Sequence, residues 1–460
     1  MSQDVLVVGA GIAGLSLAWA LERRGLAVQL IEATARPGGK IHSERSGGYL
    51  CEGGPISLSI EPPEVSALLA DIGLEGRLQR ARPGRRGVFV GGLGALPVPE
   101  SLAELAAFRP LRPWDKLALL RGLWPGRGRR GSSEDESLVA FGRRRLGRRA
   151  SETLLFPSLP GAYAMDPEKI SVRAAFPWLA DLGRAGLLRT FFDGPRRGVA
   201  LASFPGGMEE LPRALAGALG DRLLLGSPLR SLRRRGRRWV AVVESRGATH
   251  EIEADAVALA LPAHAAVAVV APLDPALAAV LASIPFAPIS LVQLGFARPA
   301  AAAEPQAAPL AIHGLYAPSA ESSDLAGAAF PSAMFPDDRA PAGHALAVAR
   351  FGGARRPDQA RLSDHDLTKL AWRELAPPAL GPGPPAFAQV VRHEAALPQY
   401  TLGHRERLEA LAAGEARHPG LFFAGNSYRG LGVVDCITDA ERLAERLEAL
   451  AVHEVSSCGP

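Results

Sequence analysis

The feature that most constrains the fold is a glycine-rich turn near the N-terminus, Gly9-x-Gly11-x-x-Gly14, which directly follows an apolar run at 5–8. The pattern predicts a strand over 4–8, a helix over 12–25 and a strand over 27–31, which together form a βαβ unit. Gly9 allows the tight turn, Gly11 lets the backbone approach a pyrophosphate, and Gly14 lets the helix pack closely on the strand. We therefore expect a Rossmann-like, dinucleotide-binding domain. The predicted contacts in the turn are Gly9, Ala10, Gly11, Ile12, Ala13 and Gly14.

An acidic residue ends the second predicted strand. Glu32 lies 18 positions after Gly14 (32 − 14), where the fingerprint requires an acceptor for the ribose hydroxyls of adenosine. The helix that follows the turn offers free N–H groups and a positive dipole end to the phosphates.

Two further features favour FAD over NAD. Glu32 is followed closely by a cation, Arg36, and by a pair of glycines that ends in Gly39 and precedes Lys40. This arrangement is typical of large FAD oxidases. Arg36 either meets a phosphate or is a solvated charge. A second glycine cluster at 425–437 follows an apolar strand and precedes a predicted helix, whose N-terminus can stabilise negative charge on a reduced isoalloxazine.

Composition excludes several classes of protein. The 460 residues predict two or three domains, and a net charge of +5 is too mild for a dedicated nucleic-acid binder. Three cysteines without a CxxC pair predict no disulfide framework or zinc site, hence a reducing compartment. His264, His393 and His404 lack metal-ligand spacing and are interpreted as structural, so no metal is predicted. The apolar run at 256–270 is interpreted as a strand, a proline and a short helix, and no leader is visible, so the protein is expected in the cytoplasm.

Several stretches together resemble the oxygen-dependent protoporphyrinogen oxidases, within the monoamine-oxidase-like flavoprotein superfamily. The stretches lie at 52–57, 203–208, 259–265, 397–404 and 425–437, and the resemblance extends from Val5 to about Leu447. It implies FAD-dependent, six-electron oxidation of protoporphyrinogen IX to protoporphyrin IX in haem biosynthesis. Each of three rounds would reduce the flavin, and O₂ would reoxidise it to give H₂O₂.

The resemblance also implies a fold of the mixed α/β and α+β class with three parts. The FAD-binding domain is expected from 1–82, 203–270 and 416–451, and the mixed-sheet substrate domain from 83–95 and 271–415. A helical, membrane-facing domain is expected at 96–202, followed by a loose tail at 452–460. Residues 137–149 are expected to form an amphipathic basic helix. Its basic residues Arg143, Arg144, Arg145, Arg148 and Arg149 either meet acidic lipid headgroups or form a solvated helix face. Peripheral membrane contact is allowed, and monomer and homodimer both stay open.

Carried over residue by residue, the resemblance assigns further contacts. Those to FAD are Lys40, Gly54, Pro55, Ile56, Ser57, Leu229, Gly425, Asn426, Leu431, Gly432 and Val433. Arg86 falls where the family holds a substrate propionate, although a surface arginine beside Arg85 is the alternative. The expected pocket walls are Leu315, Tyr316, Ala329 and Phe351. No triad or carboxylate pair is found, so no catalytic acid or base is predicted, and flavin N5 takes the hydride.

Two residues depart from the family pattern. Met165 stands where glycine is usual and would narrow the pocket, and Arg350 stands where an apolar or aromatic residue is usual. Arg350 could hold an additional carboxylate, which would favour coproporphyrinogen III as the substrate. Another FAD amine oxidase or desaturase, or an FAD-binding scaffold without turnover, is a more distant alternative.

Overall fold

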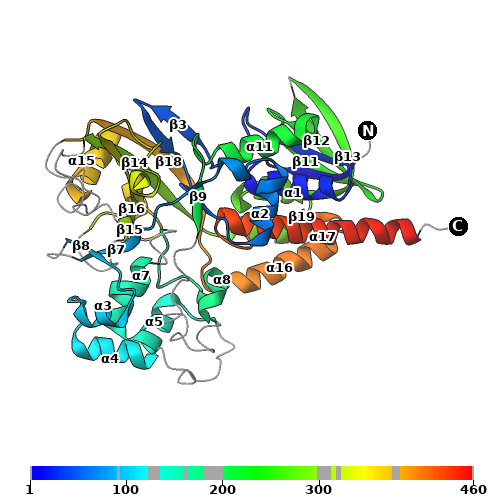
Figure 1. The fold of residues 1–460 in the computed structure, drawn as a ribbon. Helices are drawn as coiled ribbons and strands as arrows, with labels where there is room; N and C mark the ends of the chain where they lie inside the picture. The colour runs from blue at the N-terminus through cyan, green and yellow to red at the C-terminus, as the bar shows by residue number, and fades with distance from the viewer. Residues whose placement is uncertain are drawn as a thin grey trace.

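Two lobes and a helical region make up the molecule (Figure 1). The computed structural model describes residues 3–90, 94–122, 135–158, 164–180, 200–245, 247–297, 312–316, 323–375 and 384–457. Each lobe is built on a seven-stranded sheet. The helical region lies next to the second lobe, away from the two chain ends (Figure 1).

The first sheet has the order β10-β2-β1-β13-β12-β11, with β19 also paired to β13. Its parallel part pairs β1 with both β2 and β13, and β12 runs antiparallel to β13 and β11. The strands are β1 (Gln3–Val8), β2 (Val28–Ile31), β10 (Leu223–Leu224), β11 (Leu229–Arg235), β12 (Arg238–Ser245), β13 (Ala248–Leu259) and β19 (Leu421–Phe423).

Helices cover both faces of this sheet because alternate side chains of β1 point to opposite sides. Val5 and Val7 pack with the layer of α1, α11 and α17, whereas Leu6 and Val8 pack with that of α12, α13 and α16. The helices are α1 (Ile12–Arg23), α11 (Glu210–Leu219), α12 (Ala263–Val270), α13 (Pro275–Ala282), α16 (His404–Arg417) and α17 (Val433–Ser457). Thus α13 and α16 pack on the first sheet, although the expected substrate segment 271–415 includes them.

The second sheet has the order β18-β14-β17-β16-β15-β7-β8 and is antiparallel except where β15 pairs with β7. Helix α15 (Asp364–Leu375) packs on one face through Leu367, Ala371 and Leu375. The strands are β7 (Arg85–Val90), β8 (Gly94–Pro97), β14 (Phe286–Ala297), β15 (Ile312–Tyr316), β16 (Gly327–Ala329), β17 (His344–Gly352) and β18 (Phe387–Pro398).

The helical region consists of short elements. They are α3 (Leu102–Ala107), α4 (Pro113–Gly122), α5 (Leu138–Leu146), α6 (Arg148–Ala150), the π-helix η2 (Ser151–Leu155), α7 (Phe156–Ser158) and α8 (Val172–Ala175). The single basic helix expected over 137–149 is instead broken at Gly147, whose φ of 82° lies outside the helical range.

Smaller elements connect these parts. They are β3 (Ser43–Ser46), β4 (Tyr49–Glu52), β5 (Leu58–Ser59), β6 (Gln79–Arg80), β9 (Leu201–Ser203), α2 (Pro63–Asp71), α14 (Pro331–Met334) and the 3₁₀ turns η1 (Glu75–Arg77), η4 (Gly220–Arg222) and η7 (Pro357–Arg361). The strand, proline and helix expected over 256–270 are confirmed as β13, Pro262 and α12. The tail expected beyond Val452 differs, because α17 continues to Ser457 with no glycine or proline to end it.

Candidate functional site

The N-terminal glycine turn leaves the first turn of α1 open. Gly9 has a φ of 103°, and a Cβ at Gly14 would lie 1.9 Å from the Gly9 carbonyl oxygen, so both positions require glycine. Gly11 is the N-cap of α1, and no side chain caps the helix. A Cβ at Gly11 would meet no atom within 4 Å. The N-terminus of α1 thus has no side-chain cap and borders open space at Gly11, which fits a phosphate of a dinucleotide.

Glu32 is fixed at the side of this turn. Its Oε2 atom accepts a hydrogen bond from the Ala10 N–H at 2.8 Å, and its Oε1 atom accepts one from the Thr34 N–H at 2.9 Å. The Ser227 N–H donates to the Glu32 carbonyl at 2.7 Å, which brings the start of β11 and thus Leu229 to the same edge. These contacts hold the carboxylate at the carboxyl end of β2, where the adenosine ribose of a bound dinucleotide lies.

The loop after β2 crosses the glycine turn. The Gly38 N–H donates to the Ala10 carbonyl at 2.8 Å, and a Cβ at Gly39 would lie 3.3 Å from the Gly11 Cα atom. Arg36 is exposed, and its guanidinium donates to carbonyls of its own loop, that of Gly39 at 2.7 Å among them. Arg36 thus stabilises the loop that borders the phosphate site.

Lys40 links the two lobes. Its Nζ atom donates to the Ala396 carbonyl of β18 at 2.5 Å and lies 5.7 Å from the centre of the Phe286 ring. Burial lowers the pKa of Lys40 to about 8. A Cβ at Gly54 would lie 2.3 Å from the Lys40 carbonyl, so the predicted flavin-contacting stretch Gly54, Pro55, Ile56 and Ser57 passes directly beside Lys40. All four of these residues are partly exposed.

The C-terminal glycine cluster meets the N-terminal one. Gly425 has a φ of 107°, and a Cβ there would lie 3.5 Å from the Ala13 Cβ atom. The Leu431 and Gly432 N–H groups donate to Asp435 Oδ2 at 2.9 and 2.8 Å, so Asp435 caps α17, which begins at Val433. Two glycine clusters more than 400 positions apart (425 − 14 = 411) therefore form one site.

Two residues that were not among the expected FAD contacts hold this cluster in place. The Tyr400 hydroxyl donates to the carbonyls of Asn426 and Gly430, at 2.8 and 3.0 Å. His404 stacks on Tyr400 with ring centroids 3.9 Å apart, and its Nε2 atom lies 3.0 Å from the Tyr428 carbonyl oxygen. The family resemblance at 397–404 indicated that this segment matters, but it did not predict these contacts. His404 is structural, as expected.

One face of the second sheet points toward the Gly54 stretch. Gln293 donates to the Glu52 carbonyl at 2.8 Å, and His393 Nε2 lies 2.6 Å from the Gly53 carbonyl oxygen. Because side chains two residues apart share a face, the register places Gln293, Val348 and Ala329 on this side. We call this side the inner face; it carries Arg86, Tyr316, Ala329, Val348 and Arg350.

Arg86 and its neighbour Arg85 have different surroundings. Arg85 donates to Glu104 Oε2 and to the Val98 carbonyl, which fixes it to the start of α3. Arg86, one residue on, is exposed on the inner face in register with Gly314. Its guanidinium is therefore available to a ligand of this face.

Two of the expected pocket residues, Leu315 and Phe351, lie on the opposite face of the second sheet. Leu315 and Phe351 belong to the core that packs on α15, so the structure does not bring them together with Tyr316, Ala329 and Arg350. Met165 is buried in a cluster with Tyr400 and Leu431, between the helical region and the C-terminal glycine cluster. Alternation along β15 and β17 separates the first two residues from the inner face.

The fold and the two joined glycine clusters define a dinucleotide-binding protein that has a second lobe with its own sheet. A family model for flavin containing amine oxidoreductases matches residues 12–447. The chain belongs to this family.

Relatives and solved structures agree with this assignment. The chain is 31% identical over 482 residues to the chloroplastic protoporphyrinogen oxidase of Oryza sativa subsp. japonica, covering 97% of this chain and 88% of the relative. It is 30% identical over 491 residues to the protoporphyrinogen oxidase of Homo sapiens, covering 96% and 98%. The fold matches a crystal structure from Exiguobacterium sp. 255-15 with a TM-score of 0.81, at 24% identity and with 97% and 99% of the chains covered. A putrescine oxidase bound to putrescine matches with a TM-score of 0.69 at 18% identity, covering 98% and 99%.

The protein is an oxidoreductase, and its cofactor is FAD. The turn at Gly9–Gly14 and Glu32 would hold the adenosine diphosphate half, because they combine free helix N–H groups with a fixed acceptor. The Gly54 stretch would hold part of the flavin half, because the residues before it contact the inner face of the second sheet. The Gly425 cluster would hold the rest, because it adjoins the N-terminal glycine turn.

Proposed function

We propose that this enzyme oxidises protoporphyrinogen IX to protoporphyrin IX, with O₂ as the electron acceptor and H₂O₂ as the second product. The observation that carries the proposal is the similarity, over nearly the whole chain, to protoporphyrinogen oxidases of plants and mammals. The inner face supports it, since it combines an apolar cluster with the exposed guanidinium of Arg86.

The chain's own residues bind and orient the substrate. Arg86 would form a two-pronged hydrogen-bonded pair with a propionate, which sets the position of an otherwise apolar ring system. Ile289, Leu291 and Val348 form an apolar cluster with Ala164 and Ala396 on the inner face, which would keep water from the reacting carbon. When bound, FAD would supply the redox chemistry as the acceptor of a hydride from carbon.

The proposal is tested with the purified, flavin-loaded protein in air-saturated buffer. Added protoporphyrinogen IX should give porphyrin fluorescence faster than its spontaneous oxidation, with three H₂O₂ per porphyrin, one for each two-electron round. A rate equal to that of a flavin-free sample would overturn the proposal.

Arg86→Met should raise KM by roughly 10- to 100-fold with little change in kcat, because a charge-assisted pair is removed from the bound substrate. Arg82→Met is the matched control. Arg82 lies on the same segment, is exposed and forms only a loose 3.8 Å ion pair with Asp337. Equal KM values for the two variants would remove Arg86 from the site.

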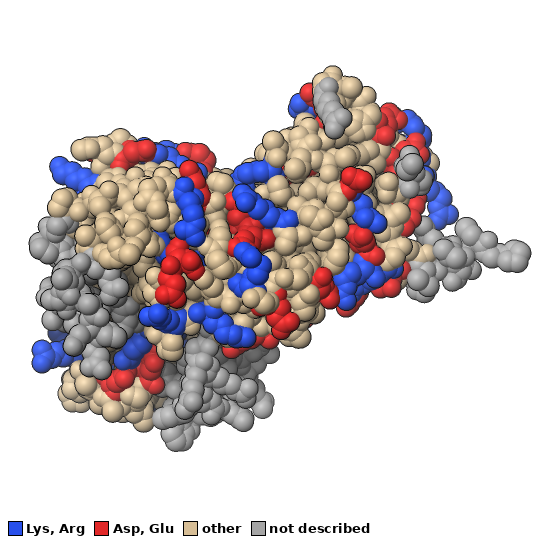
Figure 2. All heavy atoms as spheres, turned by 45° about the horizontal axis from the view of Figure 1, so that its top comes forward, with Lys and Arg blue, Asp and Glu red and all other residues tan. Residues whose placement is uncertain are grey.

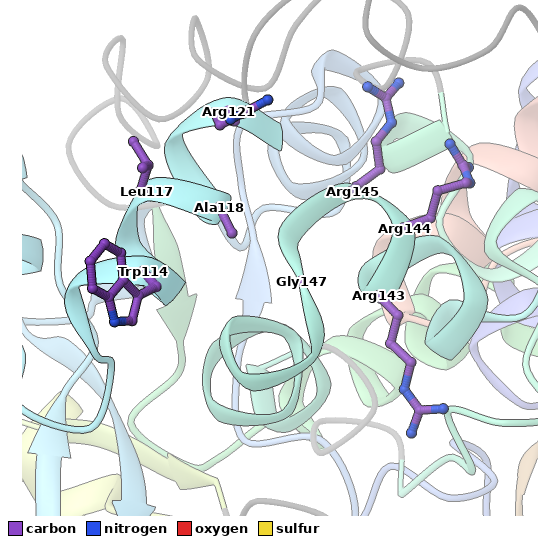
Figure 3. Close-up of a pocket in the computed structure, with 8 residues that line it drawn as sticks. All are labelled: Trp114, Leu117, Ala118, Arg121, Arg143, Arg144, Arg145 and Gly147. Carbon is purple, nitrogen blue, oxygen red and sulfur yellow. The ribbon is translucent and has the colours of Figure 1, made fainter.

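We also propose that the protein is cytoplasmic and contacts membranes peripherally through α4 and α5. Trp114 and Leu117 are 77% and 52% exposed, and α4 and α5 border a hollow of about 440 Å³ (Figure 3). Arg121 and Arg143 to Arg145 line the same hollow, although Arg143 and Arg144 also pair with Glu152 and Glu136. Exposed aromatic and basic side chains together suit an anionic lipid surface.

The charged side chains on the face drawn in Figure 2 are mixed in sign. On the described part of the face in Figure 2, acidic and basic side chains lie next to each other and form no field of one sign. Among the described residues, no helix is long and apolar enough to cross a bilayer.

Sedimentation with vesicles tests the membrane proposal. Binding should require anionic lipid and should weaken in Trp114→Ser combined with Leu117→Ser. Leu225→Ser, an exposed leucine of the first lobe, is the control and should bind like the unaltered protein. Equal partition onto neutral and anionic vesicles, or none onto either, would contradict the proposal.

A further inference from the structure

The hairpin of β3 and β4, which leads into the Gly54 stretch, is held by the second lobe. The Tyr49 ring stacks on the Phe387 ring with centroids 4.8 Å apart, and the Gln389 amide donates to the Glu44 carboxylate at 2.9 Å. Phe387 and Gln389 both belong to β18. In Figure 1, β3 accordingly lies beside the second sheet. The second lobe therefore positions the backbone that leads to the flavin.

Two side chains of the inner face bind the end of this hairpin by its backbone carbonyls. Gln293 Nε2 donates to the Glu52 carbonyl at 2.8 Å, and His393 Nε2 lies 2.6 Å from the Gly53 carbonyl oxygen. A carbonyl oxygen only accepts, so the His393 Nε2 atom carries a proton and donates. His393 is the register partner of Ile289, which belongs to the apolar cluster of the inner face. The histidine thus lies between the flavin stretch and the proposed substrate surface.

The amide of Gln293 makes its hydrogen bond at a cost to packing. The side chain is fully buried, yet its Oε1 atom pairs with no polar atom of the described residues. A buried amide oxygen without a partner is destabilising, and an apolar side chain of similar size would avoid this. What the glutamine adds over such a side chain is the bond to the Glu52 carbonyl.

The peptide bond between Gly53 and Gly54 is one whose direction has to be held. Glycine has no Cβ atom, so the two residues that flank this peptide turn freely and the peptide can reverse at little cost. The peptide is trans, and its C=O and N–H therefore point in opposite directions. Because the carbonyl points at His393, the Gly54 N–H points away from the second sheet.

On the side away from the second sheet, Gly54 adjoins the glycine turn of the first lobe. A Cβ at Gly54 would lie 2.3 Å from the Lys40 carbonyl oxygen, and one at Gly39 would lie 3.3 Å from the Gly11 Cα atom. Gly54 is partly exposed, whereas Gly53 is buried. Among the described residues, no acceptor pairs with the Gly54 N–H. This N–H is therefore a donor available to the cofactor.

We infer that His393 is a positioning residue for the flavin, because it holds the peptide between Gly53 and Gly54 so that the Gly54 N–H donates to the isoalloxazine of bound FAD. Gln293 supports this by fixing the preceding carbonyl. A donor there stabilises the negative charge that accompanies reduction, so His393 raises the reduction potential of the flavin. A reversed peptide would present its carbonyl oxygen and oppose that charge. The inference rests on the proposed function only in that bound FAD accepts the electrons, and not on which compound supplies them.

The reduction potential of bound FAD, measured in the purified flavin-loaded protein against a reference dye, tests the inference. His393→Phe keeps a planar ring without a donor and should make reduction about tenfold less favourable, a fall of about 30 mV for a two-electron couple. His393→Gln should keep the potential of the unaltered protein, because its amide supplies an N–H in place of Nε2. His365→Phe, at an exposed histidine of α15, is the matched control and should also leave the potential unchanged.

Two results would overturn the inference. An unchanged potential in His393→Phe would show that the peptide keeps its direction without the histidine. An equal fall in His393→Phe and His393→Gln would assign the effect to packing of the ring and not to its donor. The measurement uses no porphyrinogen, so either result leaves the proposed function standing, and a failed oxidation assay leaves the inference standing.

The test also applies to variants that bind FAD weakly or do not fold. If His393→Phe loses FAD on purification, titration with oxidised and with reduced FAD gives the same ratio, and binding of the reduced form should weaken about tenfold more. If His393→Phe does not fold, Gln293→Met replaces it and should lower the potential by a smaller factor. An unchanged potential in Gln293→Met would then overturn the inference.

Discussion

The Tyr400 hydroxyl lies 2.8 Å from the Asn426 carbonyl oxygen, although the two residues belong to different segments of the chain. The hydroxyl also donates to the Gly430 carbonyl, so it holds both ends of the loop that follows β19. Tyr400 itself is buried and stacked on His404, which fixes its ring. Tyr400, which lies outside the sheet of the first lobe, therefore positions the loop that would contact the flavin.

Tyr400→Phe should weaken FAD binding. The change leaves two carbonyl acceptors without their donor, which costs about 1 to 3 kcal/mol and loosens the loop. We expect the FAD dissociation constant to rise about tenfold, measured by flavin fluorescence on dilution. Leu402→Ala, an exposed residue of the same segment, should leave the constant unchanged. Tight FAD binding in Tyr400→Phe would show that the loop keeps its shape without this bond.

Gly11→Ala should separate folding from cofactor binding. Gly11 has φ −69° and ψ 174°, which alanine adopts without strain, and a Cβ there would meet no protein atom within 4 Å. The methyl group would instead occupy the space through which the phosphate approaches. The variant should fold with an unchanged circular dichroism spectrum but bind FAD about tenfold or more weakly.

The control for this change is Gly217→Ala in α11, another glycine whose added Cβ would meet nothing within 4 Å. It should keep its flavin and gain roughly 0.5 to 1 kcal/mol of stability from helix propensity. A Gly11→Ala protein that retains full flavin would place the phosphate elsewhere.

The βαβ unit at the start of the first lobe could be predicted from sequence because its signals are local. The turn at Gly9–Gly14, the helix after it and Glu32 lie within 24 positions (32 − 9 + 1), and their geometry follows from the turn itself. The second sheet could not be predicted to the same depth. Alternation shows that Leu315 and Tyr316 point to opposite faces, but only the packing of α15 decides which face is core.

Contacts between distant segments were also beyond sequence reasoning. Tyr400 with Asn426, and Lys40 with Ala396, depend on how the lobes meet and leave no periodic pattern in either segment. The predicted basic helix over 137–149 failed for a local reason, because Gly147 adopts a positive φ and ends α5. Arg86 and Arg350 were each expected near substrate, but their shared face emerged only from the strand register.

Asp274 should stabilise the first lobe in a pH-dependent manner. It caps α13 by accepting the Leu277 N–H at 2.9 Å, and it pairs with Arg417 at 2.7 Å, so its pKa is lowered, first by the cap and then by Arg417. A lowered carboxyl pKa contributes stability that is present above the unfolded-state pKa near 3.9 and is lost as pH falls through the folded-state value. Asp274→Ala should cost about 1 to 2 kcal/mol at neutral pH.

The measurement is urea unfolding of the Asp274→Ala variant from pH 7 down to pH 3. Its deficit relative to the unaltered protein should shrink as the pH falls below about 4. Asp358→Asn, at an almost fully exposed carboxylate with a loose 3.7 Å pair to Arg361, should show no deficit at any pH. A deficit that is constant over the whole range would mean that packing, not the charge of Asp274, carries the effect.

Lys40 should produce a pH dependence at the alkaline end. Its pKa is about 8 because of burial, whereas an unfolded lysine has about 10.4, so between these values the unfolded chain binds more protons. Stability therefore rises with pH across this window, and below about 8 the full cost of the buried charge, at most ~3 kcal/mol, is present. Lys40→Met removes that cost but also the hydrogen bond to the Ala396 carbonyl. Compared at equal flavin content, the variant should gain stability relative to the unaltered protein at pH 7 and lose this advantage progressively toward pH 10. A difference that does not change with pH would show that the ammonium group is solvated, and Lys40 would then link the lobes only through its hydrogen bond.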